Sequence, residues 1–235
     1  MTFDRRLFIW LSIAFVLVTV VGTITHEFGH YIVAKSFGYR AHISYGYTWY
    51  YDPVNDEFTR SIYSKYQAEI KAGDDFPEKE KYERLQKKSG EDGFWIWLGG
   101  PLETNLTGTI GLIFLFLLRK SFYNTTKLAF KQWFFIFISL FWLRPLANFV
   151  CWAGLYIMRG KSCGWTDEFY LAYRLNLPEW TIAASTALIG AIVLTVVIIK
   201  FVPTKQRLTF IASGLVGGIT GAILWLELLG KVIMP

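Results

Sequence analysis

Five long apolar runs restrict what this 235-residue sequence can fold into. A helix needs about 20 apolar residues to cross the hydrocarbon core of a bilayer. Runs of that length occupy residues 7–29, 94–118, 130–158, 181–202 and 208–230. With 53% hydrophobic residues and a mean hydropathy of +0.34, the chain is too apolar for an ordinary soluble domain. We therefore predict an all-α polytopic protein, integral to the membrane, with about five transmembrane helices.

The net charge of +6 does not indicate nucleic-acid binding, because the basic residues are scattered over short loops and the ends of the apolar runs. They gather before the first run, between the second and third, and between the fourth and fifth. By the positive-inside rule, these three regions share the cytoplasmic side, which predicts a cytoplasmic N-terminus. The expected partners are the lipid bilayer and a membrane protein or peptide, not nucleic acid.

A polar loop at residues 39–93 follows the first run. We expect the first helix to continue to about Ser36 or Phe37, with Gly38 just past its end. Residues 41–51 are aromatic and rich in β-formers, which predicts a strand or β-hairpin. Residues 60–72 and 77–88 have the composition of short soluble helices, and Gly90 follows the second.

The first apolar run ends in His26-Glu27-Phe28-Gly29-His30. Residues four apart share one face of a helix, so His26 and His30 can direct imidazole nitrogens at one zinc ion, with Glu27 beside them. A histidine in an apolar segment is usually a packed residue, and this pattern also arises by chance. The chain has only three histidines, however, and ionisable groups are costly in a bilayer. We therefore predict a Zn²⁺ site with Glu27 as the catalytic residue.

The face of the first helix agrees with this prediction. Ser12, Thr19 and Thr23 continue the stripe that carries the two histidines. Such a polar stripe is expected to face the interior of a helix bundle, while Leu, Ile, Val and Phe side chains face lipid.

A zinc ion held by two histidines needs a third protein ligand. Asp167 and Glu168, between the third and fourth runs, are the carboxylates best placed by order in the chain. We expect Asp167 to be the third ligand, with Glu168 as the alternative and His42 ranked below both. The structural alternative is that Thr166 caps a helix whose first turn carries the two acids.

The second run contains Gly99-Gly100-Pro101, followed by Asn105. Two glycines and a proline predict an interrupted helix, whose freed backbone groups must be sheltered from lipid. We expect Gly99, Gly100, Pro101 and Asn105 to form a substrate-binding wall beside the zinc. The alternative is a kink that lets two helices approach closely.

Two further charges lie in the apolar runs near these residues. Arg144 is in the third run, and we expect it to form a buried ion pair with Glu103 or Glu227 rather than to take part in chemistry.

These motifs resemble the site-2 protease family of intramembrane zinc metalloproteases. The resemblance rests on residues 26–30, followed by Ala34 and Gly38, and on Gly99-Gly100-Pro101. The resemblance implies that His26, His30 and Asp167 bind zinc. It also implies that Glu27 is the general base and that residues 41–51 present the substrate. The chain departs from the family at Thr104, where the family usually has Asn, and at Asp167, which does not lie in a Leu-Asp-Gly motif.

The resemblance divides the chain into a membrane metalloprotease-like core at residues 1–175, with the soluble loop inside it, and two additional C-terminal transmembrane helices at residues 176–235. The leading hypothesis is an intramembrane zinc metalloendopeptidase that hydrolyses peptide bonds of membrane-embedded or membrane-adjacent substrates. The alternative is a non-proteolytic zinc-binding membrane protein, such as a transporter, sensor or chaperone. A purely structural subunit would require an accidental motif. Glu27 separates the first two, because hydrolysis needs a base and metal binding does not.

Overall fold

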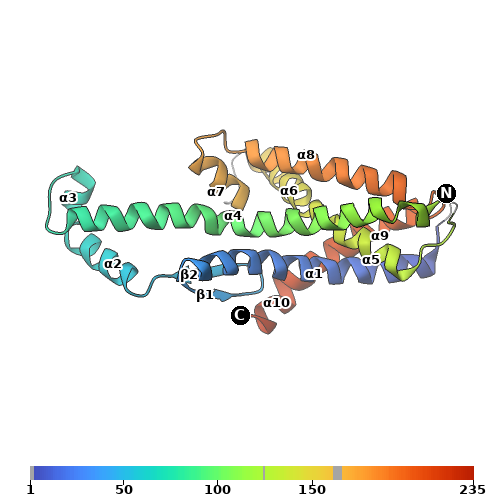
Figure 1. The fold of residues 1–235 in the computed structure, drawn as a ribbon, viewed down its shortest axis with the longest axis horizontal. Helices are drawn as coiled ribbons and strands as arrows, with labels where there is room; N and C mark the ends of the chain where they lie inside the picture. The colour runs from blue at the N-terminus through green and yellow to red at the C-terminus, as the bar shows by residue number, and fades with distance from the viewer. Residues whose placement is uncertain (1–2, 124, 161–165) are drawn as a thin grey trace.

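The computed structural model describes residues 3–123, 125–160 and 166–235, and most of them are helical (Figure 1). The helices are α1 (Arg5–Ser36), α2 (Asn55–Lys65), α3 (Gln67–Ala72), α4 (Lys79–Leu117), α5 (Phe130–Ser139), α6 (Leu143–Arg159), α7 (Asp167–Arg174), α8 (Thr181–Val196), α9 (Arg207–Ala222) and α10 (Gly230–Ile233). Strands β1 (Arg40–Ile43) and β2 (Thr48–Tyr51) form an antiparallel hairpin in which His42 is paired with Trp49. The predicted hairpin is confirmed.

Five helical segments of the described chain are long and apolar enough to cross a membrane, as predicted. They cover residues 5–36, 79–117, 130–159, 181–201 and 207–233. The fourth includes a π-helical end, η3 (Val197–Phe201), and the fifth passes through a longer π-helical segment, η4 (Ile223–Leu229), into α10.

Helix α1 begins and ends where local chemistry favours it. The Asp4 carboxylate accepts a hydrogen bond from the Leu7 N–H (3.0 Å), which caps the N-terminus. The helix ends at Ser36, and Gly38 follows with φ of +86°, a conformation that glycine adopts without strain. The predicted polar stripe faces the bundle, since Thr23 and both motif histidines are buried.

Helix α4 corrects two predictions. It runs without interruption through Gly99-Gly100-Pro101, so the predicted break is absent, and the expected short helix at 77–88 is the start of the same 39-residue helix. Gly90 therefore does not end a helix. Figure 1 shows this helix along the whole length of the molecule, with its N-terminal part projecting beyond α1.

Close packing explains why the glycines do not break α4. A Cβ atom at Gly99 would lie 3.0 Å from the carbonyl carbon of Gly29, and one at Gly29 would lie 2.9 Å from that of Gly99. The two glycines thus let the backbones of α1 and α4 touch, as in helix pairs built on small residues. Pro101 removes one helical hydrogen bond, but it is buried, and the helix continues through it.

The third apolar run carries the break instead. Helix α5 ends at Ser139, the 3₁₀ turn η2 (Leu140–Trp142) follows, and α6 begins at Leu143. Neighbouring helices shelter the turn: a Cβ at Gly108 of α4 would lie 3.0 Å from the Trp142 backbone nitrogen, and Trp142 donates its indole N–H to Thr109 Oγ1 (3.1 Å). The interrupted backbone is therefore covered by protein, as an apolar environment requires.

The C-terminal helices pack on the rest of the bundle. Helix α8 lies against α6, and α9 lies along α1. The two helices α9 and α1 are so close at Gly217 and Gly221 that a side chain at either position would collide with α1. The chain then returns to the hairpin, where the Tyr45 N–H donates to the Met234 oxygen (3.0 Å) and Trp225 donates its indole N–H to the Tyr45 oxygen (2.6 Å).

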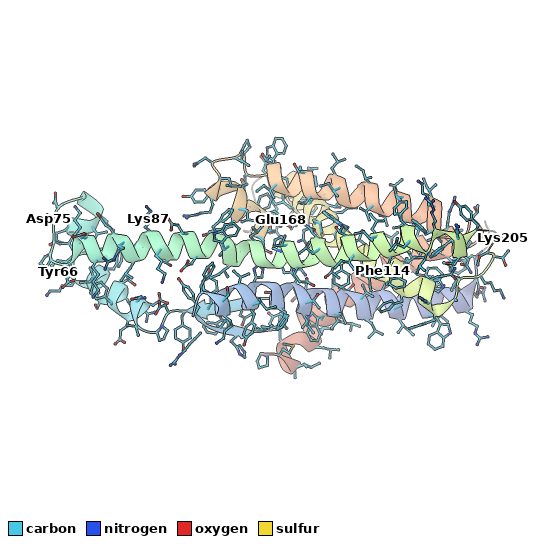
Figure 2. The ribbon with its side chains drawn as sticks, viewed as in Figure 1. Tyr66, Asp75, Lys87, Phe114, Glu168 and Lys205 are labelled. Carbon is cyan, nitrogen blue, oxygen red and sulfur yellow. The ribbon has the colours of Figure 1, made fainter. Side chains whose placement is uncertain are left out.

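The polar loop forms a separate layer at one end of the molecule. Helices α2 and α3 and the start of α4 enclose a small apolar cluster of Ile62, Phe76 and Tyr82. Figure 2 labels Tyr66, Asp75 and Lys87 at this end, and Lys205 at the opposite end.

Candidate metal centre

Helices α1 and α7 bring His26, His30 and Asp167 together. The Nε2 atoms of the two histidines are 3.3 Å apart, and Asp167 Oδ2 lies 2.7 Å from His26 Nε2 and 3.5 Å from His30 Nε2. Ligands about 2.0–2.1 Å from a tetrahedral zinc ion lie about 3.3 Å from one another. Two of the three separations match this value and the third is shorter, so the residues fit a metal ion of that size.

The other ring nitrogen of each histidine is held by a hydrogen bond. His26 Nδ1 is hydrogen-bonded to Thr104 Oγ1 (2.9 Å), and His30 Nδ1–H donates to the backbone oxygen of Ile96 (2.7 Å). With Nδ1 engaged in this way, Nε2 is the nitrogen of each ring that faces the other histidine and Asp167. Metal-binding histidines usually have such a partner, because it fixes the tautomer and the ring orientation.

Gly100 keeps the space beside the histidines open. A Cβ atom there would lie 2.7 Å from His26 Nε2 and closer still to His30 Nε2. A residue with a side chain would therefore press on the nitrogen atoms that face the proposed ion. This cradle is a second observation, independent of the motif, that fits a bound metal.

Aromatic contacts hold α7 in place. Tyr170 stacks on Trp97 of α4 with ring centroids 4.7 Å apart, and Phe169 packs on Trp152 of α6 at 5.1 Å. At the end of α7, Arg174 Nη2 donates to the Gly90 oxygen (2.8 Å). Because these contacts fix the helix against both neighbours, its first residue, Asp167, faces the histidines.

The two adjacent acids of α7 have different environments. Burial acts to raise the pKa of Asp167, but hydrogen bonds with His26 and His30 outweigh it and hold that pKa well below its usual range. Burial raises the pKa of Glu168, which favours its neutral form.

The two alternative ligands do not join the cluster. Among the described residues, only His26, His30 and Asp167 form a group able to hold a metal. Glu168 is buried on α7, beside α4 in Figure 2, and His42 is exposed on β1. The structure thus brings the expected third residue to the site, while its role as a ligand stays a prediction.

Glu27 lies beside the cluster. The Thr48 hydroxyl of β2 donates to the Glu27 backbone oxygen (2.8 Å) and is 3.1 Å from carboxylate Oε2. The hairpin therefore fixes the side chain that the motif places next to the metal ligands.

The predicted partner of Arg144 differs from the one in the structure. Its Nη2 lies 4.0 Å from Glu27 Oε1, not beside Glu103 or Glu227, so the expected pair is wrong. Glu103 accepts a hydrogen bond from Thr107 (2.9 Å), and Glu227 forms a surface ion pair with Lys231 (2.9 Å). Arg144 lies in the first turn of α6, directly after the 3₁₀ turn, and lines the same cavity as Glu27. A cation in an apolar run was the signal that could have indicated a functional role.

These groups line a cavity of about 430 Å³. Its walls combine His26, His30, Asp167 and Glu27 with side chains from the hairpin, α4 and α6, including Tyr47, Tyr50, Trp97, Arg144, Asn148 and Trp152. Helix α4 contributes Ile96 and Trp97 to the lining, and Thr104, rather than Asn105, touches His26. The substrate-binding role expected for Gly99, Gly100, Pro101 and Asn105 stays a prediction.

The fold and the cluster define a helical protein with five membrane-length helices and a His-His-Asp group in a cavity among them. No family model, curated protein or solved structure matches this chain.

Proposed function

We propose that this chain is an intramembrane zinc metalloendopeptidase that hydrolyses membrane-embedded or membrane-adjacent polypeptides. The observation that carries the proposal is the convergence of His26, His30 and Asp167 with Glu27 in one cavity, although Asp167 lies 141 residues from His26. Such a convergence is not needed for packing. Two histidines and one carboxylate are also a ligand set found in catalytic zinc sites, which keep a fourth position open.

Zinc bound by this cluster would supply Lewis-acid activation of a water molecule and of a peptide carbonyl. The protein supplies the proton transfers. Glu27 accepts a proton from the attacking water at its carboxylate and returns it to the amine that leaves when the C–N bond breaks. Thr48, at 3.1 Å from Oε2, holds that carboxylate in one orientation.

Arg144 is placed to bind a substrate oxygen. Its side chain is partly exposed and lines the cavity, where its Nη2 lies 4.0 Å from Glu27 Oε1. A guanidinium here would stabilise negative charge that develops on the scissile carbonyl oxygen.

The substrate would bind in an extended form. A helical peptide hides its carbonyl groups, whereas a strand can add to the edge of the β1–β2 hairpin next to the site. The aromatic walls contributed by Tyr47, Tyr50, Trp97 and Trp152 suit apolar side chains of a membrane polypeptide.

The test is Glu27→Gln, which keeps size but removes the base. We expect purified variant protein to retain about one zinc per chain, as a single mononuclear site requires. Cleavage should fall by about 100-fold or more, the usual cost of losing general acid–base catalysis. The control is Glu91→Gln, which changes an exposed carboxylate of α4.

The assay co-expresses single-span proteins that carry helix-breaking residues near one membrane face and compares their gel mobility. Accumulation of full-length protein only with Glu27→Gln supports proteolysis. Equal processing by the wild type and by Glu27→Gln, each with zinc bound, rejects the mechanism in which Glu27 is the base. Zinc without processing anywhere in a broad panel favours a zinc-binding transporter, sensor or chaperone.

A further inference from the structure

A second cavity, of about 250 Å³, lies between the chain that follows α4 and the connection from α8 to α9. In Figure 2 this connection, marked by Lys205, is at the opposite end of the molecule from the polar loop. Its polar lining consists of three cations and three hydroxyl groups, from Lys200, Lys205, Arg207, Thr125, Thr126 and Thr204. Among the residues that the structure describes, no acid lines this cavity.

The surrounding end of the molecule is strongly basic. Residues 3–12, 118–133 and 197–209 contain nine Lys or Arg residues and a single acid, Asp4. That acid already caps α1. In the part of the chain that the structure describes, no carboxylate forms an ion pair with the three cations of the cavity, so their charge is open to an anionic ligand.

The three cations are not equivalent. Arg207 donates from Nε to the Val202 oxygen (3.2 Å) and from Nη2 to the Ile199 oxygen (2.6 Å), so it caps the end of the α8 segment. The Lys200 ammonium lies 5.6 Å from the Phe116 ring centroid. Arg207 thus fixes the wall of the cavity, and the two lysines provide the charge that a ligand can use.

Exposed apolar side chains lie in the cavity lining and next to it in the chain. Ile199 lines the cavity and is 58% exposed, and Leu208, which follows Arg207 but is not part of the lining, is 45% exposed. Both residues lie at the ends of membrane-length segments, where acyl chains would reach them. Inorganic phosphate could use only the polar part of this site, whereas a phospholipid could use both parts.

We propose that this cavity binds the phosphate group of an anionic phospholipid, with its acyl chains beside Ile199 and Leu208. Basic pockets between helices at the membrane surface are suited to such headgroups. The competing explanation is that the cations serve only as topology signals and helix caps. In that case charge would act diffusely, and no individual lysine pair would matter more than another.

The experiment measures binding of short-chain phosphatidylglycerol, phosphatidylcholine and inorganic phosphate to the purified full-length chain by native mass spectrometry. The test variant is Lys200→Gln with Lys205→Gln. The matched control is Lys120→Gln with Lys127→Gln, which removes the same charge from the same end outside the cavity. Zinc content and melting temperature establish that both variants are folded.

We expect phosphatidylglycerol to bind at least about 10-fold more tightly than phosphatidylcholine, and the test variant to lose about 10-fold, since each lysine near an anionic headgroup contributes several-fold. The control should change less than about 3-fold. Equal losses in both variants would show diffuse attraction and overturn the proposal. Equal binding of phosphatidylcholine would overturn it as well, and phosphate binding as tightly as phosphatidylglycerol would assign the site to a free anion. The proposal does not depend on proteolysis.

Discussion

At the scale of single residues, the different positions of Asp167 and Glu168 relative to the histidines are a consequence of helix geometry. Adjacent residues point about 100° apart on a helix, so only one of them can face the histidines. Asp167 does so at 2.7 and 3.5 Å, while Glu168 is buried elsewhere on α7. The order of the chain could narrow the third ligand to this pair, but only the packing of α7 distinguishes the two.

Asp167→Ala should therefore lower zinc affinity much more than Glu168→Ala. Loss of an outer-shell partner typically costs 10–100-fold in metal affinity, so loss of a direct ligand should cost at least about 100-fold. Competition with a chelator of known affinity measures the difference. The opposite ranking would assign the ligand to Glu168, and no effect from either substitution would exclude α7 from the site.

Arg144 provides a second prediction at this scale. Arg144→Met keeps a long side chain but removes every donor, so zinc should stay bound while cleavage falls by about 100-fold, as expected for one lost oxyanion donor. Arg144→Lys, which keeps the charge but not the guanidinium geometry, should recover part of the activity. If the Met variant cleaved at the wild-type rate, Arg144 would have no role in the reaction.

At the scale of elements, the positions of the glycines do not predict where the helices break. Local sequence rules associate Gly-Gly-Pro with a break. In α4 the same residues permit contact with α1 and clearance around the histidines, and the helix continues. The break at η2 has no glycine, and its local signal is Pro145 in the first turn of α6, which lacks the N–H that a continuous helix would donate to the Phe141 oxygen. Whether a proline interrupts a helix depends on the packing around it, because Pro101 lies inside the continuous α4 whereas the helix before Pro145 is interrupted.

Gly100→Ala tests the clearance. Alanine favours helix by about 1 kcal/mol over glycine, so α4 itself should not be weakened. The added methyl group would press on both Nε2 atoms, and zinc content should fall while circular dichroism stays helical. Gly218→Ala on α9 is the matched control, because a Cβ there meets nothing within 4 Å. Full zinc occupancy in the Gly100→Ala variant would contradict a metal site beside Gly100.

At the scale of the whole molecule, the sequence predicted which helices and strands form better than it predicted how they pack together. Hydropathy predicts five membrane-length helices, and aromatic patterning predicts the hairpin, because both depend on local residues. The docking of α9 on α1, and of α7 between α4 and α6, depends on contacts between residues far apart in the chain. Those contacts determine the shape of the cavity and bring Arg144 into its lining.

The proposed metal ion would also connect distant parts of the molecule, which leads to the last prediction. His26 and His30 lie on α1, and Asp167 lies on α7, so a ligand of the folded state would bridge the two helices. A ligand that binds only the folded state stabilises it by about 2.7 kcal/mol at 100 times its dissociation constant. Removal of zinc by a chelator should therefore lower the melting temperature of the detergent-solubilised wild type, and added zinc should restore it. Asp167→Ala should show a much smaller response to either treatment, because its bridge is already lost. An equal response in both proteins would mean that zinc stabilises the chain from another site.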